Sequence, residues 1–130
     1  MKFDLIDQVL DTQPDALTAV KNVTVGEDYL ADHFPGYPVL PGVMMIEAMV
    51  QAARRLLEQR HGMGPGDPVV LKQVRNIRYG NMVRPGEQLR VTITLRKHDA
   101  DKNLWEFQGV GAVDDEVAVQ GRFELERLQV

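Results

Sequence analysis

One segment of this sequence, residues 42–61, restricts the folds that the chain can adopt. Its pattern is helical, and its first half is apolar nearly all round instead of along one stripe. A helix of that kind is buried on most of its sides, and one antiparallel sheet curled around it would provide the burial. An exposed sheet edge or an uncovered side of the helix would then favour a dimer. The helix is expected to end where glycine and proline cluster, at Gly62, Gly64, Pro65 and Gly66.

Strand patterns occupy most of the remaining chain. The clearest runs over residues 88–97, where apolar and polar side chains alternate as they do in a sheet with one buried face. Its apolar set is Leu89, Val91, Ile93 and Leu95. Further strands are expected at residues 16–25, 69–79, 104–113 and 117–125, and a short amphipathic helix at residues 4–10. These elements predict an α+β fold, and the length of 130 residues suits a single domain covering residues 1–130.

The composition excludes several classes of function. The chain has no cysteine, which rules out disulfides, a thiol nucleophile and thiolate metal sites, and no other spacing matches a metal site. No apolar run is long enough to span a membrane, and the first residues lack the apolar core of a signal peptide. We therefore expect a cytoplasmic protein without a metal, and nothing in the sequence indicates a nucleic-acid partner.

Charge is distributed unevenly along the chain. The formal net charge is −4, yet residues 72–97 hold seven basic residues against Glu87 alone, a local charge of +6. A basic stretch on an otherwise acidic protein predicts an anionic partner. A set of solvated strand faces would explain the same residues, so both interpretations stay open.

Three residues near the start of the predicted helix could carry acid–base chemistry. Glu47 interrupts the apolar helix; a buried carboxyl group must be partnered or protonated, and the protonated form can serve as a general acid. His33 lies in the loop before the helix, and histidine can take or give a proton near neutral pH. Gly42 would let a ligand approach the unpaired amides at the helix N-terminus, which can stabilise a developing oxyanion.

Each of these residues also has an ordinary explanation. Glu47 could lie on an exposed edge of the helix, His33 could be a solvated loop side chain, and Gly42 could simply follow Pro41 at a helix start. Together, however, they place a base, an acid and an oxyanion donor within fifteen residues. Removal of an α-proton and expulsion of a β-hydroxyl from a thioester require those three parts. No Ser-His-Asp context or phosphate-binding glycine loop offers a competing site.

The stretch from His33 to Gln51, HFPGYPVLPGVMMIEAMVQ, closely resembles the signature of the FabZ-type 3-hydroxyacyl-[acyl-carrier-protein] dehydratases. Residues 17–25 and 84–89 resemble two other segments of that family, so the likeness covers most of the chain. The resemblance implies a hot-dog fold, in which an antiparallel sheet wraps a long helix. It also implies a homodimer, which in the family often assembles into a trimer of dimers, and no cofactor.

The resemblance further implies roles for single residues. His33 of one subunit would face Glu47 of its partner across the dimer interface. The amide of Gly42 would bind the thioester oxygen, and the carbonyl of Val39 would orient the ring of His33. Gln51 would support the acid.

The acyl chain would lie in an apolar tunnel, and Tyr79 occupies a position where the family has an aromatic that lines or gates it. Two positions depart from the family pattern: Asp32 stands where glycine is usual, and Val50 where alanine is usual. An acid beside His33 would favour the protonated ring and weaken it as a base. Both departures leave room for a paralogue with an altered substrate.

The implied reaction is dehydration of a (3R)-hydroxyacyl-[acyl-carrier-protein] to the trans-2-enoyl form, in fatty-acid or related lipid biosynthesis. In a variant of this mechanism, His33 performs both proton transfers and Glu47 only positions the hydroxyl or a water. A hot-dog acyl thioesterase and a non-catalytic acyl-binding paralogue are the alternatives. The basic segment would dock the acidic acyl carrier protein, chiefly through Arg78 and Arg84, which are expected near the tunnel mouth.

Overall fold

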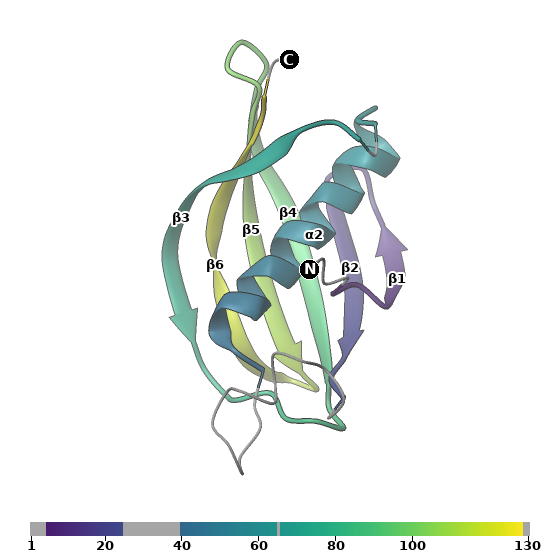
Figure 1. Ribbon diagram of the computed structural model, residues 1–130, viewed down its shortest axis with the longest axis vertical. Coiled ribbons are helices and arrows are strands. Elements are labelled where there is room, and N and C mark those ends of the chain that lie inside the picture. The colour runs from purple at the N-terminus through teal and green to yellow at the C-terminus, as the bar shows by residue number, and fades with distance from the viewer. Residues whose placement is uncertain (1–4, 25–39, 65, 129–130) are drawn as a thin grey trace.

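The computed structural model describes residues 5–24, 40–64 and 66–128, and within these residues the chain forms six β-strands and one long helix. All six strands join one antiparallel sheet, in the order β1-β2-β4-β5-β6-β3. The sheet curls around the helix, as the apolar helix predicted (Figure 1). In chain order the elements are β1 (Gln8–Thr12), β2 (Ala16–Asn22), α2 (Gly42–Arg60), β3 (Val69–Tyr79), β4 (Gln88–Asp99), β5 (Leu104–Val113) and β6 (Glu116–Arg127).

Two tight turns produce the meander of β4, β5 and β6. Asn103 precedes β5 with a φ of 53°, and Asp114 follows it with a φ of 54°. Asn and Asp adopt this left-handed region more readily than other non-glycine residues, because their short polar side chains can hydrogen-bond to the local backbone. Asn103 and Asp114 therefore explain why the short turns predicted between these strands form.

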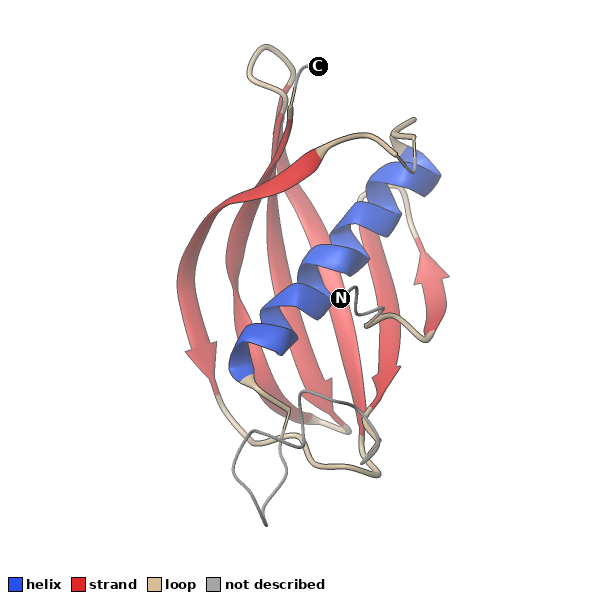
Figure 2. Cartoon of the chain, in the orientation of Figure 1, coloured by secondary structure: helices blue, strands red, loops and turns tan. Residues whose placement is uncertain are grey.

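The core lies between α2 and the face of the sheet that it crosses (Figure 2). The apolar residues of β4 point into it, and Leu89, Val91 and Ile93 are fully buried, as their alternation predicted. On β5, a Cβ added at Gly109 would lie 2.5 Å from the Sδ atom of Met49, so glycine allows the helix to approach the strand closely. The helix residues buried against the sheet are Met45, Ala48, Met49, Ala52, Ala53, Leu56 and Leu57.

Most of the strand predictions are confirmed. β3 and β5 have the expected bounds, β4 and β6 extend slightly beyond them, and β2 ends at Asn22 instead of residue 25, which lies outside the described residues. The prediction of a short helix at residues 4–10 is wrong, because Gln8–Thr12 forms β1 and pairs with β2. A helix of seven residues gains few hydrogen bonds, whereas β1 satisfies the outer edge of β2.

The helix is buried on fewer sides than its sequence predicted. Val43 is 69% exposed, and Glu47 is exposed as well, both on the side of α2 away from the sheet. One chain covers one face of the helix, and the apolar residues of the opposite face remain available to another surface. Separately, no helix in the described part of the chain has the length and apolarity needed to cross a membrane.

Candidate active site

The N-terminus of α2 has backbone amides without an acceptor inside the helix. Pro41 precedes the helix with a φ of −60° and a ψ of 144°, and the N–H groups of Met44 and Met45 donate to its carbonyl at 3.0 and 3.2 Å. The N–H groups of Gly42 and Val43 come before the first N–H that has an acceptor in this turn, that of Met44, and they lie at the positive end of the helix dipole. Such amides can bind a carbonyl oxygen on which negative charge develops.

Tyr79, the last residue of β3, packs against this end of the helix. A Cβ added at Gly42 would lie 2.7 Å from Cε1 and 2.8 Å from Cζ of the Tyr79 ring. Glycine therefore permits a contact that any larger residue would displace. A backbone hydrogen bond of 2.7 Å from Leu40 to Val83 also joins the segment before α2 to the segment after β3. The structure thus brings Gly42 and Tyr79 together.

Glu47 lies in the second turn of α2 on the exposed face, one turn after Val43. The expectation that Glu47 is buried is wrong for a single chain, because the sheet covers only the opposite face of the helix. Gln51 lies one turn further along the same face, and its Nε2 donates to Oε1 of Glu47 at 3.2 Å. The structure therefore joins Glu47 and Gln51 by a hydrogen bond.

Gln51 has a second hydrogen bond that nothing in the sequence indicated. Its Oε1 accepts from the backbone N–H of Leu5 at 2.8 Å, across 46 positions of the chain. Leu5 is buried, so its apolar side chain signals only a core residue. Nearly every residue has a backbone N–H, so the residue type at position 5 could not indicate that Leu5 contributes to the site.

Two residues of the predicted site fall outside the described residues. His33 and Val39, together with the neighbouring Asp32, belong to residues 25–39. Their predicted roles, as base, as orienting carbonyl and as a modifier of the base, therefore stay predictions. Among residues 5–24, 40–64 and 66–128, no three His, Cys, Asp or Glu side chains gather closely enough to hold a metal ion.

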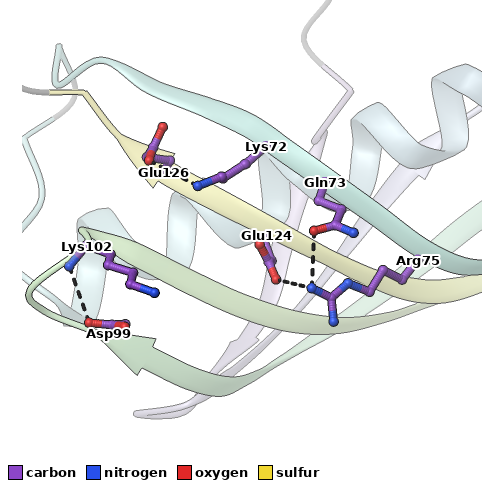
Figure 3. Close-up of polar contacts among 7 residues, drawn as sticks. All are labelled: Lys72, Gln73, Arg75, Asp99, Lys102, Glu124 and Glu126. Carbon is purple, nitrogen blue, oxygen red and sulfur yellow. Dashed lines mark hydrogen bonds and ion pairs between the residues drawn. The ribbon is translucent and has the colours of Figure 1, made fainter.

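The basic segment is already partly neutralised within the chain. Lys72 lies 3.6 Å from a carboxylate oxygen of Glu126, and Arg75 lies 2.9 Å from one of Glu124, which are ion pairs between β3 and β6 (Figure 3). Arg78 follows on β3 opposite Gln120, and it forms no ion pair with any described residue. Among the described residues, Arg78 thus differs from Lys72 and Arg75 of β3 in having no carboxylate partner.

Arg84 has different surroundings from Arg78. Its backbone N–H donates to Oε1 of Glu87 at 2.7 Å. It also lines a shallow pocket together with Glu87, Asp114 and Asp115 of the turn between β5 and β6, and Glu116 at the start of β6. The structure therefore places Arg84 near carboxylates, whereas Arg78 lines a pocket with Asn76, Gln108, Gln120 and Arg122.

The comparisons with known proteins agree with this architecture. Residues 1–122 match the model of the FabA-like domain family. The 3-hydroxyacyl-[acyl-carrier-protein] dehydratase FabZ of Rickettsia bellii is 36% identical over 122 residues, which cover 93% of this chain and 83% of the relative. The protein of the same name from Rickettsia massiliae is 35% identical over the same shares of the two chains.

Solved structures confirm the fold. The dehydratase heterocomplex ApeI:P of Xenorhabdus doucetiae contains a chain similar to this one, with a TM-score of 0.79 and 20% identity over 97% of this chain and 84% of that one. Thioesterase superfamily member 2 of Mus musculus gives a TM-score of 0.68 and 18% identity over 94% of this chain and 81% of that one. The fold is therefore common to proteins of different activity, and the sequence relatives decide between them. The chain belongs to the FabA-like family of hot-dog proteins, among the FabZ-type 3-hydroxyacyl-[acyl-carrier-protein] dehydratases.

Proposed function

We propose that this chain carries out the reaction for which its FabZ relatives are named, the dehydration of 3-hydroxyacyl-[acyl-carrier-protein], as a step of fatty-acid biosynthesis. In this proposal a (3R)-hydroxyacyl thioester loses its α-proton and its β-hydroxyl as water and becomes the trans-2-enoyl thioester. The observation that carries the proposal is the placement of an acid, Glu47, on the exposed face of α2, one turn from the N–H groups at its start that have no acceptor within the helix.

Each step falls to a group of this chain. His33 takes the α-proton, and the amide of Gly42 stabilises the enolate-like oxygen of the thioester. Glu47, in its protonated form, donates to the departing hydroxyl. The carbonyl of Val39 orients the ring of His33, and Tyr79 lines the acyl tunnel.

The exposed face of α2 supports a site made by two subunits. Val43 and Glu47 are exposed on it, and Ile46 and Val50 are only partly buried. β3 is an edge strand, and its Val70 and Leu71 are each 40% exposed. A second copy of the chain would cover these apolar residues and deliver His33 of the partner subunit to Glu47. A homodimer, assembled further into a trimer of dimers, is therefore part of the proposal, as are a single domain and a cytoplasmic location.

The acyl carrier protein is proposed to dock on the basic segment. Arg78, without an ion pair among the described residues, supports this docking, whereas Lys72 and Arg75 already pair with Glu126 and Glu124. Arg84 contributes less net attraction, because the carboxylates of its shallow pocket offset its charge. Arg78 and Arg84 both stay in the proposal, with Arg78 as the stronger contact.

The reaction can be tested directly with purified protein. It is offered 3-hydroxyacyl chains of several lengths on acyl carrier protein, and the mass of the carrier-bound acyl group is followed with time. Dehydration appears as loss of water with the acyl group still attached to the carrier. Release of a free hydroxy acid would indicate the thioesterase alternative, and no change with any chain length would contradict an acyl-thioester enzyme.

A further inference from the structure

A chain of hydrogen bonds links the N-terminal segment to the proposed catalytic acid. The backbone N–H of Leu5 donates to Oε1 of Gln51 at 2.8 Å, and Nε2 of Gln51 donates to Oε1 of Glu47 at 3.2 Å. One amide side chain thus joins a backbone group near the start of the chain to the carboxyl group of Glu47. Gln51 is thus hydrogen-bonded to both Leu5 and Glu47.

The N–H of Leu5 decides which way the Gln51 amide faces. A backbone N–H can only donate, so the oxygen of the amide must point toward Leu5. The amide nitrogen, which can also only donate, then points toward Glu47. If the amide were reversed, two donors would meet at Leu5 and two acceptors at Glu47. The orientation of Gln51 is therefore set by a residue outside the helix.

The segment that supplies this N–H is held firmly to the rest of the molecule. Leu5 and Ile6 are 1% and 4% exposed and belong to the core. The next residue, Asp7, donates its N–H to the carbonyl of Val20 at 2.9 Å and accepts at Oδ2 from the N–H of Asn22 at 2.6 Å. The donor to Gln51 therefore has a defined position relative to both the sheet and the helix.

We infer that the backbone N–H of Leu5 makes Leu5 a positioning residue, which acts through Gln51 to assign different tasks to the two oxygens of Glu47. Oε1 accepts from Gln51 and is thereby reserved as an acceptor. The transferable proton then resides on Oε2, which faces the substrate hydroxyl. This inference rests on the proposed role of Glu47 as the acid and adds what holds the proton on one side of it.

The helix contains a matched control for Gln51. Gln59 lies two turns further on and also ties the N-terminal strand to α2, because its Oε1 accepts from Oγ1 of Thr12 at 2.9 Å. At a rise of about 1.5 Å per residue, Gln59 lies roughly 18 Å along the helix from Glu47. Like Gln51, it is a glutamine of α2 that accepts a hydrogen bond from the N-terminal part of the chain, but it does not contact Glu47.

The test compares Gln51→Glu with Gln59→Glu. A glutamate at 51 can still accept from Leu5, so the clamp survives, but it presents an acceptor instead of a donor to Glu47. We expect kcat on carrier-bound substrate to fall by roughly 10- to 100-fold in Gln51→Glu, as for a misplaced catalytic group. KM and the midpoint of thermal unfolding should stay close to wild type, and Gln59→Glu should change none of the three. Equal effects of the two substitutions, or a kcat above half of wild type in Gln51→Glu, would overturn the inference.

A second arm isolates the N–H of Leu5. The α-hydroxy analogue of leucine at position 5 replaces the N–H by an ester oxygen and leaves the buried side chain intact. It should lower kcat in the wild-type background and have no further effect once Gln51→Met has removed the amide. An equal loss in both backgrounds would show that the N–H acts through folding alone and would refute the positioning role.

Glu47→Gln, measured beside these variants, separates this inference from the proposed function. If Glu47→Gln retained activity, Glu47 would not be the catalytic acid, and the proposed mechanism would be refuted as a whole. Activity lost in Glu47→Gln but kept in Gln51→Glu would overturn only the positioning role of Leu5 and Gln51.

Discussion

The two faces of α2 have different surroundings. The face toward the sheet carries Met45, Met49 and Leu56, which are buried within the chain. The opposite face carries Val43 and Glu47, which are exposed. Because the first half of α2 is apolar nearly all round, one of its faces can be buried by its own sheet and the other by a second surface. Glu47, the proposed acid, lies on the face that the described part of the chain leaves exposed.

The largest effect is expected from removing the acid on the exposed face. Glu47→Gln keeps the shape of the side chain and loses its transferable proton, so kcat should fall by about 10²- to 10⁴-fold, the usual contribution of a general acid. The thermal unfolding midpoint should hardly change, because the side chain is exposed in the single chain. Glu58→Gln, further along the same helix, is the control and should keep full activity. A Glu47→Gln enzyme with more than half the wild-type rate would refute the acid role.

Subunit mixing tests whether the exposed face is completed by a second chain. His33→Ala and Glu47→Ala should each be inactive, since each lacks one proton-transfer group. After subunit exchange, a mixed dimer has one site with both groups intact, so activity should return to at most half of wild type per dimer. If native mass spectrometry shows exchange and no activity returns, the two groups do not act across an interface.

Truncations on the two faces should separate folding from association. Leu56→Ala removes a fully buried side chain and should lower the free energy of unfolding by about 2–5 kcal/mol, measured with urea. Val43→Ala truncates a side chain that is 69% exposed and should instead weaken self-association, seen by sedimentation at low protein concentration. A reversed pattern would mean that the exposed face is not an interface.

The smallest effect is expected outside both faces, at the proposed carrier surface. Arg78→Glu should raise KM for carrier-bound substrate severalfold, and Arg84→Glu should raise it less, because carboxylates already surround Arg84. Neither change should affect turnover of a small thioester mimic. Added salt should weaken wild-type activity on the carrier-bound substrate, because exposed charges are screened within about 8 Å at physiological ionic strength. Equal losses on both substrates would exclude Arg78 and Arg84 as docking residues.

Several features could be predicted from the sequence because each depends on local residue order. The alternation that ends in Ile93 and Leu95 follows from the two-residue period of a strand, and the bounds of β3 and β5 follow from similar patterns. The start of α2 at Gly42 follows from the proline before it. Family resemblance added the roles of Glu47, Gly42 and Tyr79, and the structure brings the last two into contact.

Other features depend on which segments meet in space, and the sequence could not specify them. Residues 8–12 form a strand because β2 offers an edge for pairing, although their local pattern also suits a helix. Glu47 is exposed because a single sheet can cover only one side of a helix. The amide of Gln51 is oriented by the backbone N–H of Leu5, and the leucine side chain does not indicate that this N–H has such a partner.

The sequence by itself determined the periodicities, the turns and the types of reactive group, since these are properties of neighbouring residues. The tertiary structure decided which face of α2 the chain buries, which strand edge β1 occupies and which donor faces Glu47. These outcomes depend on contacts between residues far apart in the chain, such as Leu5 and Gln51, whose energies arise only once the sheet has closed around the helix.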